Sequence, residues 1–229
     1  MHGYHGKVLH IDLTEQTYCL RPLEPSRLRM TVGGVGLGSS LLFEHAPPGV
    51  DPFALDNPIV FASAPLVGTG LTTTAKYAVV TKSPLTGFIA DSLSSSYFAL
   101  ELKKLGSDAL VITGRAAKPV YLFLRNESVE FRDARAFWGM SPLQTEASIK
   151  KDLRDKEVRI ASIGLAGENR VRFTTLSNEG RHAGRGGVGA VFGSKNLKAI
   201  AIRGSRHAGV ADPKQLEQIG VELRKASLG

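Results

Sequence analysis

Residues 178–203 concentrate the residue types best suited to binding an anion. Five glycines and three basic side chains precede a short predicted helix and an apolar strand over 199–202: Gly180, Gly184, Gly186, Gly187, Gly189, Arg181, His182 and Arg185. Glycine allows close backbone approach and turns successive N–H groups toward one point. A helix N-terminus adds partial positive charge, and arginine supplies forked donors. This segment predicts a loop that holds a phosphorylated, anionic ligand.

The same loop contains the G-x-G-x-x-G spacing at Gly184, Gly186 and Gly189. That spacing is a weak signal by itself, because a dinucleotide site also needs a strand leading directly into the loop. The sequence shows no such strand, so we do not predict a Rossmann site.

Composition limits the function classes. The chain has 229 residues, 42% of them hydrophobic, and a formal charge of +8. It is long enough for one large domain or two small ones, and it is not disordered in composition. The basic residues are scattered and form no nucleic-acid-binding motif, so we expect no nucleic-acid partner. With no apolar run of about 18 residues and no signal peptide, we expect no membrane partner and a cytoplasmic location.

Cys19 is the single cysteine of the chain. It excludes an internal disulfide and a cysteine-built metal cluster within these residues. Because it falls in a predicted strand, we expect it to be a small buried hydrophobe.

The chain is an internal duplication. Each half begins with a predicted hairpin, followed by a helix, a buried strand, a second strand, a polar loop of small residues and a closing strand. The pairs of segments are 7–20 and 120–131, 38–44 and 141–152, 58–64 and 158–163, 77–81 and 171–175, 91–96 and 181–189, and 108–114 and 198–204. The closing strands are 90 residues apart, and the same offset places Ser94 and Ser95 opposite Gly184 and Arg185. Two repeats around a pseudo-twofold axis would bring the polar loops to equivalent places beside one ligand, although duplicated halves can also serve stability alone.

This organisation predicts an α+β fold of mixed β-sheets with short helices, rather than a doubly wound sheet. We expect one domain over 1–210, with repeats at about 7–116 and 119–206. Asp212 and Pro213 are typical of a helix start, so 211–229 is expected to begin a following helical domain that is cut short here.

Several motifs resemble the N-terminal domain of the aldehyde:ferredoxin oxidoreductase family. They are KSPLTGF at 82–88, IGLAGEN at 163–169, and AGRGGVGAVFGSKNLKA at 183–199, with FWG at 137–139 and YHGKV at 4–8. Their order is that of the family, and the resemblance covers residues 1–212.

The resemblance implies a tungsten or molybdenum enzyme that oxidises aldehydes to carboxylic acids. Electrons would leave through a [4Fe–4S] cluster to ferredoxin or an electron-transfer subunit. The family holds its metal between two pyranopterins, as tungstopterin or molybdopterin, whose phosphates are bridged by Mg²⁺. The cluster cysteines belong to later domains, and Glu168 and Asn169 are interpreted as turn residues. No catalytic residue is therefore predicted here, and this chain alone is expected to be inactive.

The family's first pterin segment corresponds to Leu93, Ser94 and Ser95, where the family tends to have Asn-Ser-Gly. The backbone carbonyl of Leu93 is implied as a magnesium ligand, and Ser95 is a departure that would change the loop conformation. Lys76 stands where the family commonly has an arginine between pterin and cluster. Lysine keeps the charge but loses the planar donor set.

The family's second pterin segment corresponds to Arg181, His182, Ala183, Gly184 and Arg185. The two arginines are expected to pair with phosphate or ring acceptors of the pterin. Ala183 is expected to offer its carbonyl to magnesium, and His182 is either a pterin donor or a solvent-facing side chain.

Two other functions stay open. The chain could be a freestanding carrier of the pterin cofactor or a non-catalytic subunit, or it could belong to a relative that reduces aromatic acyl thioesters. The choice of metal is open as well. In each case we expect a homo-oligomer or a heteromer.

Overall fold

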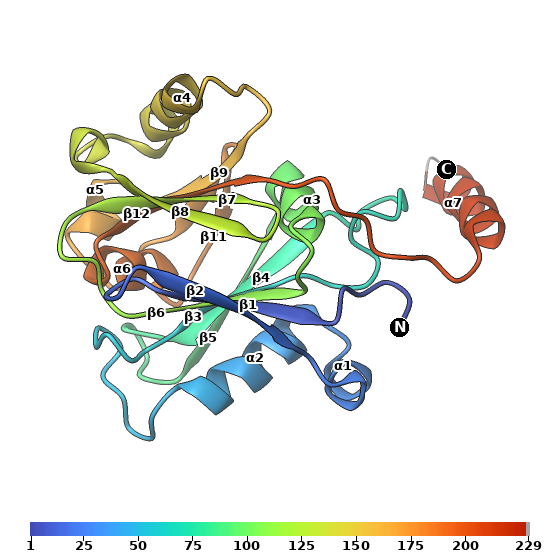
Figure 1. Ribbon diagram of the computed structural model, residues 1–229, viewed down its shortest axis with the longest axis horizontal. Coiled ribbons are helices and arrows are strands. Elements are labelled where there is room, and N and C mark those ends of the chain that lie inside the picture. Colours follow the sequence, from blue (N-terminus) through green and yellow to red (C-terminus); the bar gives the residue numbers. More distant parts are fainter. Residues whose placement is uncertain (228–229) are drawn as a thin grey trace.

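The computed structural model describes residues 1–227, which form two six-stranded mixed sheets, one from each repeat (Figure 1). The first sheet has the order β2-β1-β6-β3-β4-β5, with bounds Thr17–Pro22, Lys7–Asp12, Ala109–Thr113, Ile59–Ala62, Lys76–Lys82 and Ile89–Ser95. The second has the order β11-β10-β9-β12-β7-β8, with bounds Arg181–Ala183, Leu176–Asn178, Arg159–Ser162, Leu197–Arg203, Val120–Arg125 and Ser128–Asp133.

The two sheets have the same topology. In each, the first strand of the repeat pairs parallel with the last, β1 with β6 and β7 with β12, while every other neighbouring pair is antiparallel. The predicted α+β class and the internal duplication are both confirmed.

The main core lies between the sheets. Two short helices, α3 (Tyr97–Lys104) and α6 (Val188–Ser194), are packed there against strands of both sheets. Aromatic rings form its centre. The ring centroid of Phe61 lies 5.9 to 6.1 Å from those of Tyr77, Phe98 and Phe192. Burial of apolar surface on this scale is the dominant stabilising contribution to the fold.

Two further apolar clusters close the outer faces of the sheets. On the first sheet, α1 (Pro25–Thr31) and α2 (Gly34–His45) contribute Leu28, Leu37 and Leu41. On the second sheet, α4 (Pro142–Leu153) contributes Ile149, after the single-turn helix η1 (Arg135–Phe137). The two remaining helices are α5 (Leu165–Glu168) and α7 (Pro213–Ser227). The C-terminal helix α7 projects away from the sheets (Figure 1).

The polar segment of the first repeat is a strand, so the prediction of a loop over 91–96 was wrong. Its side chains alternate, with Ala90, Ser92 and Ser94 buried and Asp91 and Leu93 exposed. Small polar residues are typical of loops in a sequence, but the buried serine hydroxyls have partners inside the fold. Ser95 is the last residue of this strand and does not adopt a left-handed φ.

The second repeat departs from prediction in two places. Residues 171–175 form a turn and an unpaired stretch instead of a strand, because Val171 and Thr174 make local backbone hydrogen bonds to Ala166 and Val171. Strand pairing starts only at Leu176. Residues 181–183, predicted as loop, form the edge strand β11.

The pairing registers also shift the alignment of the repeats. Ala62 pairs with Ala78, which pairs with Leu93, whereas Ser162 pairs with Ser177, which pairs with His182. Leu93 is therefore equivalent to His182, and Ser94 to Ala183. The offset of 90 residues holds for the closing strands but is 89 here, because the second repeat has one more residue before its closing strand: 17 positions separate His182 from Ala199, and 16 separate Leu93 from Ala109.

Two local predictions have opposite outcomes. Cys19 lies in β2, as predicted, but it is exposed, as are most residues of this edge strand. Asp212 caps α7 as predicted, accepting a hydrogen bond from the Gln215 amide at 2.9 Å.

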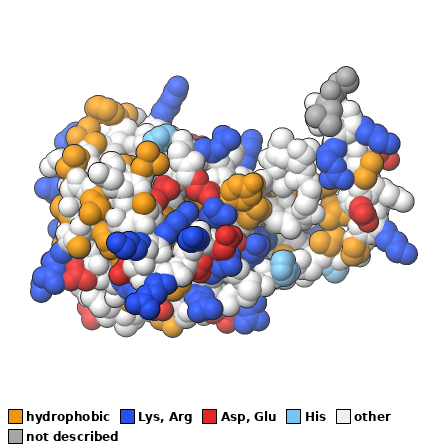
Figure 2. Space-filling view, turned by 90° about the horizontal axis from the view of Figure 1, so that it is seen from above, with side chains coloured by type: hydrophobic (Ala, Val, Ile, Leu, Met, Phe, Trp, Pro, Cys, Tyr) orange, Lys and Arg blue, Asp and Glu red, His pale blue; other side chains and the backbone are white. Residues whose placement is uncertain are grey.

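The described residues 1–227 include no helix long and apolar enough to cross a membrane. On the face drawn in Figure 2, lysine and arginine side chains are interspersed with acidic ones, so they form no continuous basic stripe there.

Candidate functional site

The candidate site is a groove between the edge strands of the two sheets, β5 and β11, which contact each other. A cavity of about 520 Å³ opens there. Its lining consists of Lys76, Leu93, Ser94, Ser95, Gly180, Arg181 and His182. The fold thus brings together six of the nine residues predicted to bind the cofactor, from segments about 90 positions apart.

The groove continues into a second hollow of about 650 Å³ that shares Lys76, Ser95 and Arg181 with the first. Here Arg159 makes an ion pair of 2.9 Å with Glu179 and lies 5.0 Å from the centroid of the Tyr97 ring. The guanidinium of Arg159 is therefore neutralised and held by protein groups.

Three cations at or next to the groove are not neutralised in this way. Lys76, Arg181 and Arg185 are exposed, and within residues 1–227 their side chains make no ion pair or hydrogen bond. Unpaired cations on one concave surface create a positive potential that attracts anions. No carboxylate lines the smaller cavity, so that potential is not cancelled locally.

His182 has one ring nitrogen engaged. Its Nδ1 lies 3.0 Å from the hydroxyl oxygen of Thr175, which leaves Nε2 available to the groove. The Thr175 hydroxyl can either donate to Nδ1 or accept from it, so this contact orients the ring in both tautomers.

The remaining three predicted residues lie beside the groove instead of lining it. Ala183 is fully buried, and Gly184 begins the turn that leads to α6. Arg185, Gly186 and Gly187 follow with left-handed φ values of 63°, 66° and 77°. Arginine in this conformation is strained by about 1–3 kcal/mol, a feature found at ligand-binding sites.

Buried polar groups lie beneath the groove. The Tyr77 hydroxyl is enclosed without a hydrogen-bond partner, and burial raises the pKa of this phenol. Burial also raises the pKa of Glu146, whose carboxylate accepts a hydrogen bond from the Glu179 amide at 3.1 Å. Sequence reasoning identified neither group, because no local pattern marks a residue that becomes buried only when the repeats assemble.

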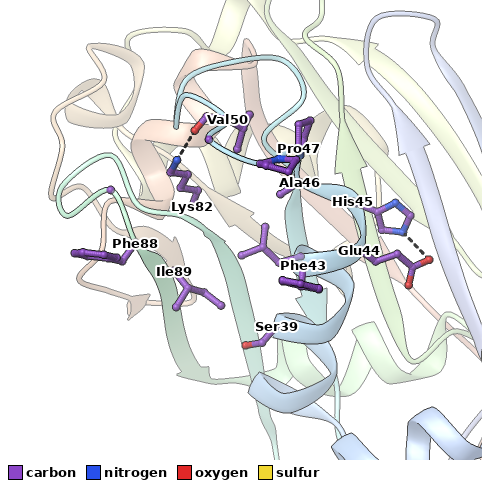
Figure 3. A pocket seen from close by; sticks show the side chains of 14 residues that line it. Ser39, Phe43, Glu44, His45, Ala46, Pro47, Val50, Lys82, Phe88 and Ile89 are labelled. Atoms are coloured by element: carbon purple, nitrogen blue, oxygen red, sulfur yellow. Dashed lines mark hydrogen bonds and ion pairs between the residues drawn. The ribbon is translucent and has the colours of Figure 1, made fainter.

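A larger cavity of about 770 Å³ lies elsewhere, between the end of α2, residues 46–50 and residues 82–89 (Figure 3). Its walls are mainly apolar and include Phe43 and Phe88, both strongly exposed. The Lys82 ammonium group points to the Val50 carbonyl and donates to it at 2.6 Å. It contains none of the predicted site residues and no unpaired cation, so it does not share the anion-binding chemistry of the groove.

Comparison of the sequence with known protein families gives one match over most of the chain. Residues 8–204 match the sequence model described as "Aldehyde ferredoxin oxidoreductase, N-terminal domain". The chain belongs to the aldehyde ferredoxin oxidoreductase family. The resemblance inferred from the motifs is confirmed, as is the N-terminal position of the match.

Individual relatives cover almost the whole chain. A tungsten-containing aldehyde ferredoxin oxidoreductase of Pyrococcus abyssi is 48% identical over 227 residues, which are 98% of this chain and 37% of the relative. The WOR-like subunit of an aliphatic sulfonate oxidoreductase of Pyrococcus furiosus is 38% identical over 221 residues, 90% of this chain and 35% of the relative.

A solved structure agrees in fold. The active-site complex BamBC of benzoyl coenzyme A reductase, in complex with 1,5-dienoyl-CoA, superposes with a TM-score of 0.95 at 35% identity. The match covers 98% of this chain and 34% of the other. The chain thus spans little more than a third of the length of these relatives.

Proposed function

We propose that residues 1–210 form the platform on which a tungsten bis-pterin cofactor lies in a longer oxidoreductase. The supporting observation is the convergence of Lys76 and Arg181 on a groove between equivalent strands of a duplicated domain, where neither side chain has a partner among residues 1–227. A pseudo-symmetric site suits a ligand with two similar phosphorylated halves. Family membership and the tungsten-containing relatives support the same assignment.

The donor set fits such a ligand. Arg181 and Lys76 supply charged donors for phosphate oxygens, and His182 supplies one more from Nε2. Magnesium prefers hard oxygen ligands, so the carbonyls of Leu93 and Ala183 are proposed to complete its coordination with the phosphates. The registers match Leu93 with His182, so the two proposed carbonyl donors come from positions that are not equivalent in the two repeats.

In the proposed mechanism the bound cofactor supplies the redox chemistry, and this chain binds, orients and shields it. Lys76 and Arg181 hold the anionic end against the edge strands. Ser94 and Ser95 form the floor of the groove between them. The buried Tyr77 hydroxyl keeps its proton, since its raised pKa lies far from neutrality.

The reaction we propose for the complete protein is oxidation of an aldehyde to a carboxylic acid. Electrons would pass through a [4Fe–4S] cluster, held by a following helical domain that begins near residue 211, to ferredoxin or an electron-transfer subunit. A second candidate is reduction of an aromatic acyl thioester. It is supported by the close structural match to the benzoyl coenzyme A reductase complex.

The test is purification of the complete polypeptide under anaerobic conditions from cells supplied with tungstate or molybdate. Metal and pterin are quantified per chain, and turnover is measured with aldehydes and with benzoyl-CoA. We expect about one metal and two pterins per polypeptide. Absence of pterin would exclude the platform role, whereas pterin without turnover of either substrate class would favour the carrier or non-catalytic subunit.

A further inference from the structure

Four buried polar side chains connect the two repeats directly behind the groove. Asn178 of β10 is fully buried, and its amide donates to the Ser94 hydroxyl at 3.0 Å and to the Arg181 carbonyl at 3.4 Å. It therefore contacts the first repeat and the backbone of a groove arginine at the same time.

Two further serines of the first repeat hold the glycine-rich turn of the second. The buried Ser92 hydroxyl donates to the Arg185 carbonyl at 3.1 Å. The Ser83 hydroxyl donates to the Gly186 carbonyl at 2.8 Å and accepts from the amides of Leu85 and Thr86. The acceptors of both serines are residues with left-handed φ.

We propose that Asn178, Ser83, Ser92 and Ser94 are positioning residues for the cofactor groove, an inference that rests on the proposed function. They fix the separation of β5 and β11 and hold the strained turn of Arg185 in its binding conformation. None of the four would replace the cationic donors. They act through Arg181, Arg185 and the backbone around them, so the affinity for the cofactor depends on them.

Energetic reasoning distinguishes this role from ordinary packing. A buried hydroxyl without a partner contributes nothing favourable, and its removal is close to neutral. Ser162 of β9 is such a residue, fully buried with an unpartnered hydroxyl, and it makes no hydrogen bond to the other repeat. Ser162→Ala is thus a matched control for Ser92→Ala: the same atom is deleted at the same burial.

The experiment uses the complete polypeptide with its cofactor. Wild type, Ser92→Ala, Asn178→Ala and Ser162→Ala are compared by thermal midpoint, by tungsten and pterin content, and by the rate of tungsten release on mild warming. Loss of groups that orient ligand-binding residues typically weakens binding 10- to 100-fold. We expect release to be about 10-fold faster in Ser92→Ala and Asn178→Ala, and unchanged in Ser162→Ala.

Two further variants separate positioning from general stability. Ser92→Thr keeps the hydroxyl and is expected to release tungsten at a rate closer to wild type than Ser92→Ala does. Ile200→Val lowers stability through the fully buried core and leaves Asn178, Ser83, Ser92 and Ser94 unchanged.

Three results would overturn the inference. One is release of tungsten at the wild-type rate from both Ser92→Ala and Asn178→Ala. Another is equally fast release from Ile200→Val at a matched loss of thermal midpoint. The third is a wild-type protein without any pterin, which would remove the proposed function and this inference together. If Asn178→Ala does not fold, Ser92→Ala and its threonine counterpart decide the question.

Discussion

Asp108 and Lys198 occupy equivalent positions in the two repeats but carry opposite charges. The Asp108 carbonyl accepts from the Ser63 amide at 2.9 Å, and the Lys198 carbonyl accepts from the Ile163 amide at 3.1 Å. Asp108 forms a buried ion pair with Lys103, whereas Lys198 forms one with Glu168. The backbone pairing at this position is the same in both repeats, whereas the buried charge pair differs between them.

Arg181→Ala should weaken retention of the cofactor more than any other single charge removal in the groove. Arg181 and Lys76 both line the two connected hollows, and neither makes an ion pair within residues 1–227, but the planar guanidinium of Arg181 offers forked donors where Lys76 has one ammonium group. Each hydrogen bond to a charged group contributes about 1.5–3 kcal/mol, so a loss of roughly 10- to 100-fold in affinity is expected. The retained cofactor is measured as metal and phosphorus content per chain in the purified variant and in wild type.

Arg125→Ala is the control for that experiment, because Arg125 is exposed at the β7–β8 hairpin and lines neither hollow. Arg181→Lys should be intermediate, since lysine keeps the charge and loses the fork. Equal retention by Arg181→Ala and Arg125→Ala would contradict the role assigned to Arg181.

Gly187→Ala should unfold the turn in front of α6. A Cβ at this position would lie 2.1 Å from the Arg172 carbonyl oxygen, in addition to the left-handed φ of 77°. Gly180→Ala is the matched comparison, with φ of 73° and open space around the added carbon. We expect a loss of about 1–2 kcal/mol for Gly180→Ala, the ordinary strain of that conformation, and a clearly larger one for Gly187→Ala. Chemical denaturation of both variants provides the measurement, and similar losses would contradict the predicted clash.

The sequence predicted most of the fold because both repeats show the same order of helices and strands. Alternation of apolar residues located the hairpins and the closing strands, and the segment around Arg181 predicted anion binding without reference to any relative. The sequence did not identify β5 as a strand, because its serines, among them Ser92 and Ser94, are residues typical of loops. Their burial depends on partners in the other repeat, and so does that of Asn178. Contacts between repeats leave no local periodicity, which is why Ser83, Ser92 and Asn178 were missed and Ser94 was assigned only to the cofactor.

Lys195 should make stability depend on pH. Its ammonium group donates to the carbonyls of Leu55 and Gly114 at 2.8 and 3.0 Å, with no carboxylate in contact. Burial, and secondarily the charge of Arg115, lowers the pKa of Lys195 to about 7. The unfolded chain holds that proton up to about pH 10.4.

Between these values the unfolded state binds more protons, so wild-type stability should rise with pH at up to about 1.4 kcal/mol per pH unit. Below pH 7 both states are charged and this contribution to the slope vanishes. Lys195→Met should remove the rise between pH 7 and 9.5, whereas Lys118→Met, at an exposed lysine, should keep it. Parallel stability–pH curves for wild type and Lys195→Met would contradict the assignment.

The Glu168–Lys198 pair should be costly to break from one side. Both side chains are almost completely buried, Lys198 also donates to the Met140 carbonyl at 2.9 Å, and Glu168 accepts from the Gly139 amide. Burial lowers the pKa of Lys198, and the Glu168 carboxylate opposes that shift. Glu168→Gln leaves a buried ammonium group without its counter-charge, and we expect a loss of about 3–5 kcal/mol.

The double variant Glu168→Gln/Lys198→Met removes the unpaired charge and should recover a large part of that loss, as judged by chemical denaturation. Additive losses in the double variant would mean that the two side chains stabilise the fold separately. Because Glu168 and Met140 flank the 137–139 segment, the Glu168→Gln variant should also expose Trp138 further. A red shift of its fluorescence emission in the native state, reversed in the double variant, would locate the damage at that segment and not in the core between the sheets.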